Sequence, residues 1–276
     1  MAFPLQERYV NLLTDFGFKR VFGSEPNKQL LVDFLNTLLP AHHKIQSLSY
    51  KTDEKIGRLP ADRRAIFYTY CQKENGERFI VEIHKTDRCF FKDRSLFYAS
   101  FSIQEQVFQG EWNFPIVPIY SICLLDSTFS DLDKCGETAV RTVGLKDQNG
   151  NSFYENLTFV YVELSKFKKT FDQIASRQDK WLYLLKHLSE LEAQPQIFQD
   201  FVFQQLFETT EIDNFSLDDQ TSYRRSLNYY KDFEEGLERG RREEKLAIAR
   251  SLLNQLPIEA IAQTTGLEIA EIKKLQ

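Results

Sequence analysis

Residues 64–85 read RAIFYTYCQKENGERFIVEIHK, and this stretch decides the fold class of the N-terminal part of the chain. Aromatic and β-branched residues dominate both of its halves, which is typical of β-strands. Between the halves, Asn75-Gly76 is the strongest short-range signal for a tight hairpin turn. The stretch therefore predicts two antiparallel strands joined by a short turn.

The segments on both sides of this hairpin predict a mixed α/β pattern. Leucines at helical spacing predict an amphipathic helix that ends before Pro40, and aromatic residues among charged ones predict a second helix over residues 87–108. From residue 171 onward the pattern is wholly helical. Strands are predicted at 44–51, 64–72, 78–85, 116–125, 138–143 and 157–164. The order of helix, three strands, helix and further strands predicts an α/β fold with a helical C-terminal extension.

The bulk composition excludes several classes of protein. Of 276 residues, 42% are hydrophobic and 27% are charged, which is not typical of disordered, collagen-like or disulfide-scaffold chains. The formal net charge of −5 is opposite to the global basic charge of many nucleic-acid-binding proteins. DNA binding would therefore need a local basic patch.

The sequence predicts a cytoplasmic protein that is neither secreted nor membrane-spanning. Glu7 and Arg8 interrupt the apolar region that a signal peptide would need, and there is no run of about 18 apolar residues. The four cysteines lack CxxC spacing and have apolar or aromatic neighbours, which favours buried thiols over zinc ligands or disulfides. A reducing compartment is consistent with this pattern.

The second strand of the hairpin carries a carboxylate and an imidazole on one face, because Glu82 and His84 are two residues apart. Tyr68 lies on the strand expected to oppose them, and Glu54 and Asp62 precede that strand. Sites that hydrolyse phosphodiesters gather carboxylates around one or two Mg²⁺ ions, which lower the pKa of an attacking water. Spacing alone leaves a second interpretation open, in which the pair is a surface carboxylate and a structural histidine.

Longer runs of the chain add a resemblance to a known family. Residues 14–39, the run RRAIFYTYCQKENGERFIVEIHK at 63–85 and FFKDRSLFYAS at 90–100 resemble, in that order, the PD-(D/E)xK nuclease-family transposases, also called Rpn-type recombination-promoting nucleases. The similarity extends to KWLYLLKHLSELE at 180–192 and into the C-terminal region. The resemblance implies a restriction-endonuclease-like core with Mg²⁺-dependent or Mn²⁺-dependent cleavage of DNA.

Two positions differ from the family pattern. Tyr68 stands where the family has a metal-binding Asp, and His84 stands where it has Gln or Lys. The resemblance thus implies that Glu82 binds the metal and that His84 replaces the residue that orients water. Glu54 and Asp15 are candidates for a replacement oxygen ligand, which the spacing of the sequence alone does not place at the site. A phenol ionises near pH 10, so Tyr68 is a poor ligand for a hard cation. The expected function is a metal-dependent DNA endonuclease with a degenerate site.

Two alternatives remain open. One is a catalytically inactive protein with the nuclease fold that binds DNA or a protein partner, and the other is an oligomeric scaffold held by the helical C-terminal half. DNA would contact the basic residues that follow Glu82, although a solvated basic helix face explains the same pattern. These basic residues are Lys85, Arg88, Lys92 and Arg94.

The C-terminal segment predicts a small helix-turn-helix-like unit. Ala262, Gly266 and Ile272 provide the small residue, the turn glycine and the packing residue that such a unit needs. Glu268 and Glu271 would repel phosphates, so packing or homo-oligomerisation is favoured over DNA recognition. The expected domains are a nuclease-like domain at 1–170, a helical region at 171–232, and a charged helix with this unit at 233–276.

Overall fold

The computed structural model describes residues 5–40, 44–50, 67–73, 78–84, 91–104, 106, 115–126 and 138–275. The chain divides into two compact units, Met1–Tyr223 and Arg224–Gln276. Each unit has its own elements and is described by itself below.

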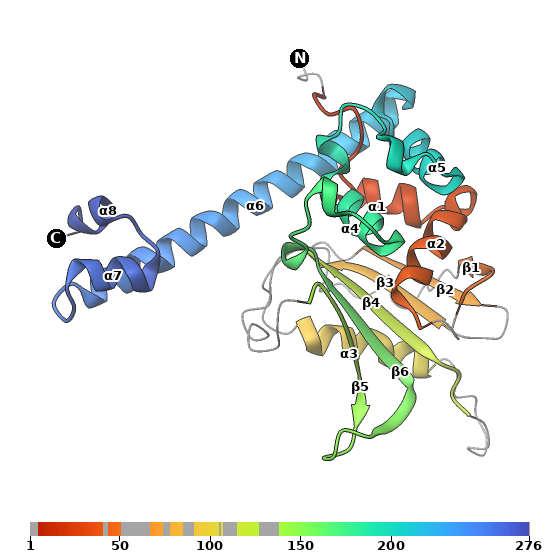
Figure 1. The fold of residues 1–276 in the computed structure, drawn as a ribbon, viewed down its shortest axis with the longest axis horizontal. Coiled ribbons are helices and arrows are strands. Elements are labelled where there is room, and N and C mark those ends of the chain that lie inside the picture. Colours follow the sequence, from red (N-terminus) through yellow and green to blue (C-terminus); the bar gives the residue numbers. More distant parts are fainter. Residues whose placement is uncertain are drawn as a thin grey trace. The chain divides into compact units, whose positions relative to one another are not determined.

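The first unit is built on a mixed β-sheet (Figure 1), in which the described strands number six. Strands β1, β2 and β3 are antiparallel neighbours, whereas β3, β4 and β6 are parallel and β5 is antiparallel to β6. The predicted antiparallel pair is thereby confirmed, and so is the mixed α/β class. In sheet order the strands are β1 (Leu48–Tyr50), β2 (Phe67–Lys73), β3 (Arg78–His84), β4 (Ile119–Leu125), β6 (Ser152–Glu163) and β5 (Val140–Lys146).

Both faces of β4 and of the C-terminal part of β6 are buried. Alternate residues of β4 and β6 form a cluster with Ala99 of α3 (Phe91–Gln104). The residues between them, which include Ile122 and Val160, are also buried. Parallel strands buried on both faces have nearly continuous apolar sequences, which explains the runs at 116–125 and 157–164. The members of the cluster are Ala99, Ile119, Cys123, Leu125, Leu157, Phe159 and Tyr161.

Helices α1 (Asp15–Phe22), α2 (Lys28–Leu38), α4 (Arg177–His187) and α5 (Phe201–Thr210) lie together, away from α3, as Figure 1 shows. The predicted helix before Pro40 corresponds to α2. The sequence pattern missed α1, which the Thr14 side chain caps by accepting a hydrogen bond from the Gly17 backbone. Short 3-10 turns connect the elements at Glu25–Asn27, Leu164–Lys166 (η6), Phe171–Gln173, Leu188–Glu190, Gln196–Phe198 and Ile212–Asn214.

Aromatic rings form the centre of this helical layer. The Trp181 side chain is fully buried, and its ring lies 5.2 Å from that of Phe203, 5.5 Å from that of Phe34 and 5.8 Å from that of Phe22, between ring centroids. The indole Nε1 donates a hydrogen bond to Asp33 at 2.6 Å. Residues that precede the strands in the sequence and residues that follow them therefore share one core.

The second unit contains the C-terminal part of α6 (Leu217–Leu252), together with α7 (Ile258–Thr265) and α8 (Ile269–Lys273). Gly266 joins the two short helices with φ 66°, a conformation that favours glycine. Ile272 packs in a cluster with Ala249, Ile261 and Leu267. Among the described helices, none combines the length and the apolar character that crossing a membrane requires.

Candidate active site

Strands β2 and β3 hold the candidate catalytic positions. The backbone register pairs Tyr68 with Glu82 and Phe67 with Ile83. Directly paired residues of antiparallel strands lie on one face with their Cα atoms about 5 Å apart, and residues 82 and 84 share a face. The backbone thus brings positions 68, 82 and 84 to one part of the sheet.

The register continues across the sheet and identifies this face. Glu82 pairs with Cys123 of β4, which pairs with Tyr161 of β6. Cys123 and Tyr161 belong to the cluster that packs against α3, so position 82 lies on the α3 side of the sheet. Tyr161 Oη and Ser95 Oγ of α3 share a buried hydrogen bond of 3.0 Å, which fixes α3 over this row of residues.

The parallel strands β3, β4 and β6 end at the same edge of the sheet, where His84 pairs with Leu125 and Leu125 with Glu163. The Glu163 carboxylate is fully buried, 3.1 Å from Lys166 Nζ and 3.6 Å from an Arg141 guanidinium nitrogen. Because β6 is two strands away from β3, Glu163 lies about 10 Å from position 84. The Glu163 carboxylate is already paired with Lys166 and Arg141.

The other predicted site residues are distributed as follows. Glu54, Lys85 and Arg88 lie outside the described residues. Lys92 is exposed at the start of α3, and Arg94 is in the same helix. Asp15 is in the first turn of α1, where its carboxylate pairs with Lys19 at 2.7 Å.

The positions that the backbone brings together match a divalent metal only in part. They supply one carboxylate, as a Mg²⁺ site requires, but a neutral phenol and an imidazole nitrogen are poor ligands for this hard cation. Among residues whose side chains the structure describes, three or more His, Cys, Asp or Glu nowhere gather in a way that could hold a metal ion.

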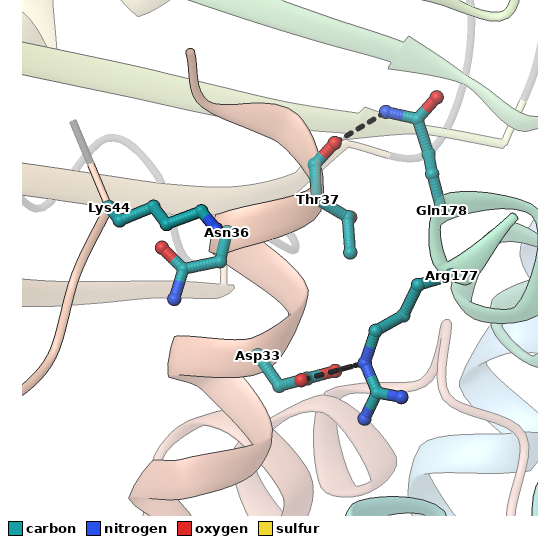
Figure 2. Close-up of a pocket in the computed structure, with 6 residues that line it drawn as sticks. All are labelled: Asp33, Asn36, Thr37, Lys44, Arg177 and Gln178. Carbon is teal, nitrogen blue, oxygen red and sulfur yellow. Dashed lines mark hydrogen bonds and ion pairs between the residues drawn. The ribbon is translucent and has the colours of Figure 1, made fainter. Parts of the chain in front are cut away.

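A pocket of about 400 Å³ lies between α2 and α4 (Figure 2). Its polar groups bind one another, as the Arg177 Nε donates to both Asp33 carboxylate oxygens at 2.8 Å and the Gln178 amide donates to the Thr37 carbonyl at 2.7 Å. These contacts hold α4 against α2, which gives this pocket a structural role. Its lining residues are Asp33, Asn36, Thr37, Lys44, Arg177 and Gln178.

A second pocket, of about 440 Å³, lies beside the end of β6 and contains Lys166, Lys168 and Lys169. In its wall, the Asp179 carboxylate accepts from Lys169 Nζ at 2.7 and 2.8 Å and from the Ser176 backbone at 3.0 Å. Burial by itself raises the pKa of Asp179, but the hydrogen bonds from Lys169 and Ser176 outweigh it and lower the pKa to about 2. The sequence pattern did not identify this pocket.

The ion pair of Asp179 predicts a loss of stability in acid. Because the pKa in the folded state is below the ordinary value of 3.8, the carboxylate stabilises the fold above about pH 4 and loses this effect as the pH falls toward 2. Asp179→Asn should lower the free energy of unfolding by about 2 kcal/mol at pH 7, and about half of the difference should be gone at pH 3. Urea unfolding of the unchanged protein and of Asp179→Asn between about pH 2 and pH 7 measures this difference in stability. A difference that does not change with pH would contradict the prediction.

Comparison with known proteins gives one match. The family model described as PD-(D/E)XK nuclease family transposase matches residues 12–240. No curated protein and no solved structure matches the chain significantly. The matched range contains the whole sheet, with positions 68, 82 and 84, and all of the helices of the first unit. The chain belongs to the PD-(D/E)XK nuclease family transposases.

Proposed function

We propose that this protein is a metal-dependent DNA endonuclease of the recombination-promoting, transposase-associated type, with a degenerate active site on a restriction-endonuclease-like core at residues 1–170. The observation that carries the proposal is the register of β2 and β3 within a chain of this family, since it puts Tyr68 opposite Glu82. DNA would be the substrate, and Mg²⁺ or Mn²⁺ the cofactor.

The proposed roles follow from the chemistry of each side chain. Glu82, with Glu54, would hold the metal ion, and His84 would orient or deprotonate water. A bound divalent ion would lower the pKa of water and neutralise phosphate charge. Tyr68 occupies the place of a carboxylate without providing a good ligand.

DNA contacts are proposed for Lys85, Arg88, Lys92 and Arg94. Of these, the exposed Lys92 lies in α3, which covers the same face of the sheet as position 82. Lysine and arginine side chains there would neutralise phosphates and fix the position of the DNA strand. Self-association through the C-terminal helices stays a prediction.

The second candidate function is an inactive protein with the nuclease fold that binds DNA or a protein partner. The identity of residue 68 supports it, because Tyr68, which pairs with Glu82 in the strand register, is a phenol instead of a carboxylate. Both candidates share the same surface for DNA, and they differ in whether a phosphodiester bond breaks.

A cleavage assay separates the two candidates. Supercoiled plasmid incubated with the purified protein and Mg²⁺ or Mn²⁺ should be nicked slowly, and the nicking should disappear in Glu82→Ala and in the closer variant Glu82→Gln. Slow nicking that persists in both variants would come from a contaminant, and the proposed endonuclease activity would then be wrong. Rapid nicking that depends on Glu82 would show that the site is not degenerate.

A further inference from the structure

Four lysines lie around the end of β6, at the sheet edge where β3 and β4 also end. Lys166, Lys168 and Lys169 follow β6 directly along the chain, and Lys186 is in the last turn of α4. The Lys186 ammonium donates to the Phe167 carbonyl at 3.1 Å, which ties α4 to the segment between Lys166 and Lys168. We call these four residues the lysine edge.

Two members of the lysine edge are neutralised by carboxylates. Lys166 Nζ lies 3.1 Å from the buried Glu163 carboxylate, and Lys169 binds both oxygens of Asp179. Lys168 is exposed, and within the described ranges no ion pair to it is found. Lys168 and Lys186 are therefore the charges of the lysine edge that remain available to a ligand.

The two available ammonium groups lie close enough to repel each other. Burial lowers the pKa of Lys186 and the charge of Lys168 lowers it further, while Asp126 and Glu190 act in the opposite direction. An anion placed between the two lysines would relieve this repulsion. The adjacent pocket of about 440 Å³, which Lys168 lines, gives such an anion room.

The position of the lysine edge relates it to the candidate active site. The row that starts at His84 ends at Glu163, two strands away, which corresponds to about 10 Å. A DNA strand carries a phosphate at every nucleotide, so a strand bound at position 82 has further phosphates for this edge to contact. Open α/β sheets bind ligands outside the carboxyl ends of their parallel strands, and the lysine edge lies there.

We propose that Lys168 and Lys186 bind backbone phosphates of the DNA strand, away from the phosphate that faces position 82. The ligand in this proposal rests on the proposed function. The geometry adds a contact surface formed by β6 and α4, separate from the basic residues near α3. It also gives a chain with a net charge of −5 two cationic contacts at one edge of the sheet.

The experiment measures DNA binding without a metal, so that it does not depend on cleavage. A short fluorescent duplex in EDTA is titrated with the full chain between about 50 and 200 mM salt. The variants are Lys168→Gln and Lys168→Glu, and the matched controls are Lys146→Gln and Lys146→Glu. Each control makes the same change of net charge as the matching Lys168 variant. Lys146 is exposed and lies at the opposite end of the β5–β6 pair, away from the lysine edge.

Lys168→Gln should weaken binding by about 5- to 10-fold near 0.1 M salt and reduce the slope of log affinity against log salt by about one. Lys168→Glu should weaken it more, and both Lys146 variants should bind within about twofold of the unchanged protein. Lys186→Gln should add to the effect of Lys168→Gln. Melting temperatures of all variants are compared, since Lys186 also bonds to the backbone.

Equal DNA affinities for the unchanged protein and the Lys168 variants would contradict the proposal that the lysine edge binds DNA. An equal loss of affinity in the Lys146 variants would contradict it as well. Failure of the proposed function looks different. If the Lys168 variants weaken binding but the protein cuts no phosphodiester bond with either Mg²⁺ or Mn²⁺, the proposal for the lysine edge is supported and the proposed endonuclease activity is wrong. If cleavage depends on Glu82 but the Lys168 variants bind DNA normally, the endonuclease activity is supported and the proposal for the lysine edge is wrong.

Discussion

Replacing Tyr68 by Asp is expected to raise both the affinity for Mg²⁺ or Mn²⁺ and the rate of plasmid nicking by at least 10- to 100-fold. The substitution returns a carboxylate to the position that pairs with Glu82 in the strand register. Changing a residue that only supports a metal ligand alters metal affinity by about 10- to 100-fold, so a direct ligand should have an effect at least that large. Titration calorimetry measures the metal affinity, and plasmid nicking measures the rate.

Two control variants make this test specific. Tyr68→Asn introduces a side chain of nearly the same shape without the charge, so it should give little gain in metal affinity. Tyr70→Asp introduces the same charge two residues along β2, opposite Ile80 instead of Glu82, and should also give little gain. If Tyr68→Asp binds the metal no better than these controls do, positions 68 and 82 do not share an ion.

The sheet could be predicted from the sequence because its signals are local or continuous. Asn75-Gly76 between two β-rich halves predicts the antiparallel pair, and the apolar runs predict β4 and β6 because strands buried on both faces do not alternate. The order of the strands in the sheet could not be predicted. The placement of β6 between β4 and β5 depends on contacts between residues far apart in the chain.

The helical layer shows what local patterns miss. Pro26 and Gly23 divide the segment before Pro40 into α1 and α2, so the first helix has only eight residues and a weak periodic signal. Its stability comes from packing with α2 and α5, which is a tertiary effect.

In the candidate site, too, some placements follow from the sequence and others do not. Glu82 and His84 are two residues apart on one strand, so their common face follows from the sequence alone. Lys168 and Lys186 belong to different elements, which the hydrogen bond from Lys186 to the Phe167 carbonyl and the ion pair of Lys169 with Asp179 hold together. A net charge of −5 gave no indication of this local concentration of lysines. Such a surface needs a structure to be found.

Trp181→Ala is expected to lower the free energy of unfolding of the first unit by about 3–5 kcal/mol. The indole is fully buried and contacts the rings of Phe22, Phe34 and Phe203, which come from α1, α2 and α5. Its removal leaves a large cavity among three helices that cannot easily move together.

The loss of packing and the loss of the hydrogen bond can be separated by a second variant. Trp181→Phe keeps most of the ring but removes the donor to Asp33, so it should cost less than the alanine variant. Phe153→Ala is the matched control, since that aromatic side chain is 78% exposed and its removal should change stability by less than about 0.5 kcal/mol. Urea unfolding followed by circular dichroism measures all three. An alanine variant as stable as the Phe153 control would show that Trp181 is not part of the core, because removing a fully buried indole cannot leave the packing of three helices unchanged.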